Sequence, residues 1–351
     1  MLIHHIIILR ISVFKTNKTL EYLKSIYNNK LTPFMPFDRL FMRGSDDQFN
    51  SLVSCSGGCV DEIVEEIKLN FVDRILNRTK LDKAVLLCNY NCIKQLKYNN
   101  CKYNGRWIFM SLLGFTELLS SGCALLKFII NLSYYKKLVR ISRGSPLRVD
   151  YLIHYGAMSL AFISSFLFHL HETVLTRNMD YFTAVFTIAM SALVTTQRNI
   201  LILISINKKN RQSGTELPKC YYVLKQTVRI IFVTGYVYHV YRMLYIDFNY
   251  KYNMVVCGIL LCLIQLNYLI TTVYYKNKHI KDKIVTLTNL IIISGVFELS
   301  DFPPLFYLMD SHFLWHAGLL LSIKPFYKFT FLEAKLYRKM FNRTKETDKR
   351  K

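Results

Sequence analysis

Long apolar runs constrain this chain more than any other feature of its sequence. A helix needs roughly 20 apolar residues to cross the hydrocarbon layer of a membrane. Seven runs come near or exceed that length, although the fourth contains His239 and Arg242 and the sixth is short. They extend from Trp107 to Leu132, Tyr151 to His169, Tyr181 to Ile206, Ile230 to Tyr245, Met254 to Tyr275, Ile284 to Phe297 and His312 to Phe331. We therefore predict an all-α, multi-pass membrane protein built as a seven-transmembrane-helix bundle.

The composition agrees with a membrane protein. Hydrophobic residues make up 52% of the 351 residues and aromatic residues 14%, which is more than the core of a soluble domain needs. This excludes a soluble two-domain enzyme. The chain also carries 46 Lys and Arg against 23 Asp and Glu, a formal net charge of +23. A nucleic-acid-binding protein is set aside, because apolar runs separate the basic clusters instead of leaving one basic stripe.

The basic residues also predict how the chain is oriented in the membrane. The segments 134–148, 207–219, 276–283 and 334–351 together hold 21 Lys and Arg, whereas the intervening segments 170–180, 246–251 and 300–311 hold two. Lys and Arg in short loops collect on the cytoplasmic side. We therefore expect the N-terminus to be luminal and the C-terminal tail to be cytosolic.

Four regions follow from these expectations. Residues 1–20 are a candidate degenerate signal peptide, because the apolar start lacks a basic n-region and Arg10 interrupts it; its cleavage is left open. Residues 21–106 form a luminal cysteine-containing segment, residues 107–333 the seven-helix transmembrane domain, and residues 334–351 a basic cytosolic tail.

Five of the nine cysteines lie before the first span: Cys55, Cys59, Cys88, Cys92 and Cys101. The charge pattern places them in an oxidising compartment, where disulfides are favoured. The two C-x-x-x-C pairs are also compatible with a zinc site, but their spacing is loose for one. We predict at least one disulfide here and leave the pairing open.

Five polar side chains occur where a membrane makes them costly: Ser165, His169, Asp180, His312 and His316. Ionisable groups in spans usually mark a functional site. Ser165 and His169 are four residues apart near the luminal end of the second span, and His312 and His316 are four apart at the luminal start of the seventh. Each pair therefore lies on one helix face. Asp180 opens the third span on the same side, so we expect all five residues in one luminal layer.

Three histidines near a carboxylate are a ligand set of catalytic zinc, which leaves the fourth position for a water with a pKa of about 7. The alternative is that histidines at helix ends are interfacial and solvated, which is the simpler interpretation for each one alone but not for the whole layer. His171 is an alternative ligand, although the helical register with Ser165 favours His169. Arg198, inside the third span, pairs with a carboxylate or a lipid phosphate, and its position does not choose between them.

These residues belong to two characteristic strings, SFLFHLHETVLTRNMDYFTA at 165–184 and FELSDFPPLFYLMDSHFLWH at 297–316. Further strings are CNYNC at 88–92, KYNGRWIF at 102–109 and HVYRMLYIDFNYKYNM at 239–254. With them the chain resembles the Per-like family of GPI-remodelling lipases, the post-GPI-attachment factors, over roughly residues 43–333. That family belongs to a wider superfamily of membrane hydrolases, together with alkaline ceramidases and the progestin and adiponectin receptors.

The resemblance implies roles for the polar layer. The superfamily pattern is a Ser, a His four residues later, an Asp eleven residues after that, and a late His-x-x-x-His. It implies His169, His312 and His316 as zinc ligands and Asp180 and Ser165 as catalytic residues. The chain departs from the family at Ser164, His171 and Glu172, which bears on the substrate fit more than on the metal site.

The activity that the resemblance implies is hydrolysis of an sn-2 acyl ester of the GPI lipid on GPI-anchored proteins, by a zinc-activated water as in a phospholipase A2 type of enzyme. Asp180 would orient the water or accept its proton, and Ser165 would assist the oxyanion, with a Ser nucleophile as the alternative mechanism. A seven-helix membrane receptor and a non-catalytic escort factor for GPI-anchored proteins are the alternative functions. Endoplasmic reticulum and Golgi membranes, the acyl-chain preference and the oligomeric state are left open.

We predict from the charge pattern that the segment from Cys55 to Lys102 is luminal and that the tail after Lys335 is cytosolic. Protease digestion of sealed vesicles, with an epitope tag in each segment, should cleave the tail tag and spare the other. A protected tail would contradict the orientation, and with it the luminal layer.

Overall fold

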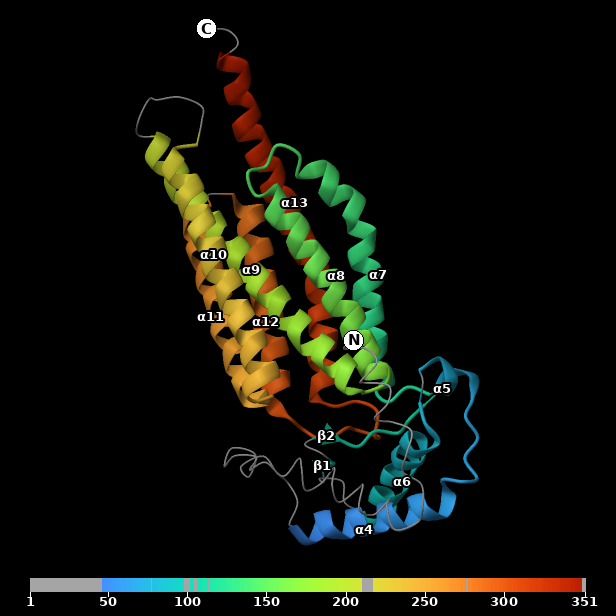
Figure 1. The fold of residues 1–351 in the computed structure, drawn as a ribbon. Helices are drawn as coiled ribbons and strands as arrows, with labels where there is room; N and C mark the ends of the chain where they lie inside the picture. Colours follow the sequence, from blue (N-terminus) through green and yellow to red (C-terminus); the bar gives the residue numbers. More distant parts are fainter. Residues whose placement is uncertain are drawn as a thin grey trace, which may run out of the picture. The chain divides into compact units, whose positions relative to one another are not determined.

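The computed structural model describes residues 46–76, 78–97, 102–103, 106–112, 114–209, 217–275 and 277–348 (Figure 1). The chain divides into two compact units. The N-terminal unit comprises Met1–Thr116 and Asp301–Asp310, and the helical unit comprises Glu117–Ser300 and Ser311–Lys351. The candidate signal peptide at residues 1–20 and Cys101 lie outside the described residues.

The helical unit consists of long helices, as the apolar runs predict. They are α7 (Leu118–Ile141), α8 (Arg148–Leu170), α9 (Val174–Lys209), α10 (Lys219–Tyr241), the short π-helix η1 (Arg242–Ile246), α11 (Tyr250–Tyr274), α12 (Lys278–Ser300) and α13 (Ser311–Asp348). Among the described residues, α7, α8, α9, α11 and α12 are long and apolar enough to cross a membrane. The all-α membrane class is confirmed, whereas the seven-span count stays a prediction, because α10 and α13 are long but fall outside these five helices.

The helices of this unit form a closed series of neighbours. α7 packs on α8, α8 on α9, α9 on α11, α11 on α12, α12 on α13, and α13 on α7, while α10 packs on α9 (Figure 1). The contact of α12 with α13 is close because α13 carries Gly318, where an added Cβ would collide with the hydroxyl of Ser294 on α12. Small residues at such contacts let helix backbones approach one another. This contact matters for the site, since Glu298 and His312 lie on these two helices.

A buried ion pair resolves the two alternatives for Arg198. Its Nε lies 2.5 Å from Oε1 of Glu333 on α13, and both side chains are buried. Tyr151 donates to the other carboxylate oxygen at 2.7 Å, and Tyr275 donates to Oε1 at 3.1 Å. A carboxylate, not a lipid phosphate, is therefore the partner of Arg198 in the structure. Because breaking a buried pair leaves an uncompensated charge, this network ties α8, α9, α11 and α13 together.

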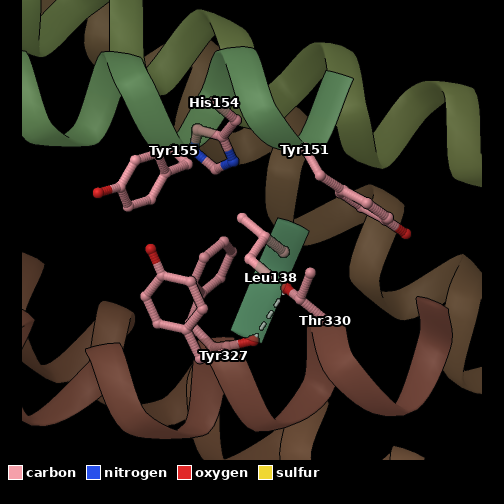
Figure 2. A pocket seen from close by; sticks show the side chains of 7 residues that line it. Leu138, Tyr151, His154, Tyr155, Tyr327 and Thr330 are labelled. Carbon is pink, nitrogen blue, oxygen red and sulfur yellow. Dashed lines mark hydrogen bonds between the residues drawn. The ribbon is translucent and has the colours of Figure 1, made fainter. Parts of the chain in front are cut away.

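A small pocket shares Tyr151 with this network, and none of the predicted site residues lines it (Figure 2). It is lined by Leu138, Tyr151, His154, Tyr155, Phe326, Tyr327 and Thr330, from α7, α8 and α13. The pocket has room for about one water molecule. It is too small to hold a lipid and is not a candidate active site.

The N-terminal unit is held together by two disulfides. Its elements are α4 (Asp46–Ile63), α5 (Phe71–Ile75), α6 (Lys80–Leu96) and a short hairpin of β1 (Lys102–Tyr103) and β2 (Arg106–Trp107). Disulfides Cys55–Cys92 and Cys59–Cys88 join α4 to α6. The predicted disulfides are confirmed, and a zinc site at the two C-x-x-x-C pairs is wrong because all four thiols are consumed.

The first span begins later than the apolar run indicates. We predicted a start at Trp107, but α7 begins at Leu118 and residues 107–116 belong to the N-terminal unit. Trp107, Ile108 and Phe109 are buried there, so their hydrophobicity serves a protein core and not the lipid. Gly114 has φ +84°, and a Cβ there would lie 2.9 Å from Cγ1 of Val72, so this tight turn favours glycine.

Asp73 is the electrostatic centre of the N-terminal unit. It is buried, and its carboxylate accepts from Arg78 at 3.1 Å and from Lys83 at 2.6 Å. Burial alone would raise the pKa of Asp73, but the hydrogen bonds from Lys83 and the Asn70 N–H, with the nearby positive charges, outweigh it and the pKa is lowered. The carboxylate therefore stabilises the fold above the unfolded-state pKa of about 3.9, and this contribution is lost as the pH falls through the lower folded-state pKa.

Replacing Asp73 should selectively loosen α5. Asp73→Asn removes the charge that compensates Arg78 and Lys83, and loss of one partner of a buried ion pair costs about 3 to 5 kcal/mol. Hydrogen–deuterium exchange of the full chain should show faster exchange of the α5 amides. Asp61→Asn, at an exposed position of α4, is the control and should leave exchange unchanged. Equal protection of α5 in both variants would contradict the role of Asp73.

Candidate metal centre

The three predicted metal ligands meet inside the helical unit. His169 lies in the last turn of α8, and His312 and His316 lie in the first turns of α13. The Nε2 atom of His316 is 3.1 Å from Nε2 of His169 and 3.1 Å from Nε2 of His312. His169 and His316 are buried and His312 is half-buried. The ligand atoms of the three residues all lie within 4.8 Å of one another, a grouping that could hold a metal ion.

Carboxylates orient two of these imidazoles from behind. Oε2 of Glu117, directly before α7, lies 2.7 Å from Nδ1 of His169. Oε2 of Glu298 on α12 lies 2.7 Å from Nδ1 of His312. A carboxylate on Nδ1 keeps the proton there and turns the Nε2 lone pair towards a metal, which is the usual outer-shell arrangement of metal-binding histidines. The backbone N–H of Glu117 also donates to the carbonyl of His169 at 3.0 Å, which ties the start of α7 to the end of α8.

The third imidazole has a different partner. Nζ of Lys127, on α7, lies 2.6 Å from Nδ1 of His316, and both side chains are buried. The Lys127 ammonium also lies 5.3 Å from the ring centroid of Phe162 on α8. His316 is therefore held by a lysine in the place where a carboxylate holds each of the other two histidines.

The chemistry of this cluster fits a zinc ion. Tetrahedral zinc with bonds of 2.0 to 2.1 Å to nitrogen places its ligand nitrogens about 3.3 Å apart, close to the two Nε2 separations of 3.1 Å. Protons held on Nδ1 of His169 and His312 leave the Nε2 lone pairs of these two imidazoles free to bind a metal ion. Three nitrogen donors also leave a fourth position for water or substrate.

The other two predicted site residues lie on the same helices as the cluster or on a neighbouring one. Ser165 is buried on α8, one turn before His169, as its spacing predicts. Asp180 is half-buried on α9 and close enough to Lys127 for a Coulombic interaction between their charges. His171, the alternative ligand, follows the last turn of α8 with extended backbone, and the three-histidine group contains His169. The roles of Ser165 and Asp180 stay predictions.

Three residues of the site carry no assigned role in the sequence interpretation: Glu117, Lys127 and Glu298. Each had a signal. Lys127 is a basic residue within an expected span, where ionisable groups usually mark function. Glu298 lies in the string FELSDFPP that carries the family resemblance. Their assignment to particular histidines needs the helix packing, because spacing along the chain does not show which helices meet.

The described residues thus define an all-α membrane protein with a histidine cluster able to hold a metal ion. A family model described as the Per1-like family matches residues 76–334, and the chain belongs to that family, which confirms the resemblance.

Named relatives agree with this family. The chain is similar to a zebrafish (Danio rerio) protein named GPI-specific phospholipase A2-like PGAP3, with 26% identity over 69% of this chain and 74% of the relative. The human protein of the same name is 25% identical over 66% of this chain and 70% of its own length. The protein PER1 homolog of Schizosaccharomyces pombe is 26% identical over 62% of both chains. No solved structure matches the chain.

The carboxylates behind the histidines should determine metal affinity. Glu117→Gln and Glu298→Gln are each expected to lower the zinc affinity by about 10- to 100-fold, because they remove the charge that holds the Nδ1 proton. The measurement is zinc content of the purified, folded protein against a graded chelator. Asp282→Asn is the control, since Asp282 is an exposed carboxylate of α12, the helix that carries Glu298. An equal loss of zinc in the control would refute the specific role of Glu117 and Glu298.

Proposed function

We propose that this chain remodels the lipid of GPI-anchored proteins by hydrolysing the sn-2 acyl ester of the GPI inositol phospholipid. The observation that carries the proposal is the convergence of the His169, His312 and His316 Nε2 atoms, with carboxylates behind two of the rings. The names of the relatives support the substrate class, because they describe GPI-specific phospholipase A2-like proteins.

The histidines would hold zinc, which supplies a Lewis acid for the ester carbonyl and lowers the pKa of a water to about 7. The chain's own residues would fix the orientation of the three imidazoles. Glu117 and Glu298 keep His169 and His312 oriented, and Lys127 holds His316. Because four helices and the residue before α7 supply these groups, the site would have its geometry before substrate arrives, as electrostatic catalysis requires.

Asp180 would act as the general base. A carboxylate on the neighbouring α9 can accept the proton of the attacking water and later return it to the leaving alcohol. Asp180 also lies close enough to Lys127 for a Coulombic interaction between the two side chains. Removing the carboxylate would slow proton transfer while leaving the three histidines in place.

Ser165 would support the reacting ester. It lies one turn before His169 on α8, so its hydroxyl is on the same helix face as that imidazole. A hydroxyl at this place can donate to the oxyanion that forms on the ester carbonyl. A serine nucleophile is the alternative, and it is less favoured because a zinc site already provides an activated water.

The cellular setting follows from the same proposal. The glycan of a GPI lipid is on the luminal side, so the site would be in the luminal half of an endoplasmic reticulum or Golgi membrane, with the N-terminus luminal and the tail cytosolic. This orientation rests on the distribution of Lys and Arg among the loops.

Two other functions are compatible with seven helices and a metal cluster. A membrane receptor would bind a ligand at the histidine layer, and an escort factor would use the metal for structure alone. Both predict that GPI lipids are unchanged when the cluster is lost.

Histidine variants test the proposal. His169→Ala, His312→Ala and His316→Ala should remove zinc and abolish GPI deacylation, measured as the lipid composition of GPI anchors in cells that lack the native protein. His154→Ala is the control, because His154 is a buried histidine of α8 that lines the separate small pocket (Figure 2). Normal deacylation by the triple histidine variant would sink the metallohydrolase proposal.

The proposed roles of Asp180 and Ser165 are tested by measuring zinc content and turnover separately. Asp180→Asn should keep zinc but lower the rate by about a hundredfold to ten-thousandfold, as loss of a general base does. Ser165→Ala should cost about a hundredfold to a thousandfold if the hydroxyl stabilises the oxyanion. Complete loss of activity in Ser165→Ala with full zinc content would instead indicate the nucleophile mechanism.

A further inference from the structure

The N-terminal unit exposes its large apolar side chains at two places. Phe71 and Ile75 of α5 are 76% and 66% exposed, and Leu305 and Phe306 are 50% and 87% exposed. Among the described residues of this unit, one further large apolar side chain, Leu87, is exposed, and to a smaller extent, at 36%. Soluble surfaces rarely gather such side chains without a partner.

Both groups of exposed apolar residues lie next to residues that contact the segment before α7, the first spanning helix. Val72 of α5 packs against Gly114, and Arg78 donates from Nη1 to the carbonyl of Gly114 at 3.0 Å. On the other side, the N–H of Met110 donates to the carbonyl of Tyr307 at 2.9 Å. All of these contacts lie within the N-terminal unit.

Chain continuity brings these places near the membrane. Gly114 lies four positions before Leu118, where α7 begins, and four residue steps span at most about 14 Å. Phe306 lies between Ser300, where α12 ends, and Ser311, where α13 begins. Two helices with the composition of membrane spans therefore have an end near these apolar places: α7 begins within a few residues of Gly114, which α5 contacts, and α12 ends within a few residues of Leu305.

The backbone around Phe306 is arranged to expose its ring. Phe306 and Tyr307 have φ of +54° and +58°, values that bulky side chains rarely adopt. Hydrogen bonds between the backbones of Leu305 and Met309, at 2.7 and 3.2 Å, close the loop. Tyr307 turns inward against Tyr90, with ring centroids 5.4 Å apart, while Phe306 stays outside. Such strain persists where the surrounding structure enforces it, and it is typical of functional sites.

The charges around α5 suit a phospholipid surface. Arg74 is exposed between Phe71 and Ile75 in the sequence, whereas the acidic residue of the same helix, Asp73, is buried against Arg78 and Lys83. The exposed side of α5 therefore presents two apolar side chains and a cation. This combination binds the boundary between lipid headgroups and acyl chains.

We propose that Phe71 and Ile75 of α5, together with Leu305 and Phe306, insert into the interfacial layer of the membrane that the helical unit crosses. The N-terminal unit is then anchored to the bilayer by these side chains as well as by its covalent connections to the helical unit. The partner is the phospholipid surface, and the proposal needs no catalytic activity, so it stands or fails separately from the proposed function.

Photo-crosslinking in lipid nanodiscs tests this with the full-length protein. A photoreactive phenylalanine analogue replaces Phe71 or, in a second variant, Phe306. The same analogue at Glu62 of α4 or Lys94 of α6, both exposed in the same unit, is the matched control. We expect several-fold more lipid adducts at positions 71 and 306 than at the controls, measured by mass spectrometry of the chain.

Each other outcome contradicts the proposal. Equal lipid adducts at test and control positions would overturn it. Adducts to a second copy of the chain, or to residues 1–45 of the same chain, would assign these side chains to a protein contact. Each variant is first checked for both disulfides, and analogues at Ile75 and Leu305 repeat the measurement for any variant that lacks them.

Discussion

Pairing of buried charged and polar groups is the constraint on which the helical unit depends. A low-dielectric interior makes an isolated ion costly, so each one needs a partner from another helix. Arg198 pairs with Glu333, Asp150 pairs with Lys225 and Arg229, and the three histidines have Glu117, Glu298 and Lys127. Apolar packing alone would let the helices slide or rotate. These pairs specify one arrangement of the helices, and the histidine cluster is part of that arrangement.

The helices are largely predictable from the sequence because apolar runs of spanning length are rare outside membrane helices. The start of α7 is misplaced because hydropathy does not distinguish a residue buried in protein from one that faces lipid. Trp107, Ile108 and Phe109 are apolar for the first reason. The first half of α10 is also missed, because Lys219, Lys225 and Arg229 dilute the apolar signal although the helix is regular.

The site is also predictable only in part: its histidines are predictable, and their outer partners are not. His312 and His316 share a helix face by spacing, and the resemblance joins them to His169. The outer partners are harder to assign, because Glu117 is 52 residues from His169 and Lys127 is 189 residues from His316. Spacing along one helix shows which side chains share a face. Which helices meet depends on packing over the whole unit, and no short stretch of sequence contains that information.

The wide separation of the ligands along the chain has a consequence for biosynthesis. His169 and His316 are 147 residues apart, and His316 lies on α13, which is synthesised after α8. Before α13 joins α7 and α8, the chain offers one imidazole and no binding site. A metal ion that needs all three histidines can therefore bind only after α13 has packed against α7 and α8, so a chain in which this packing fails would lack the complete site.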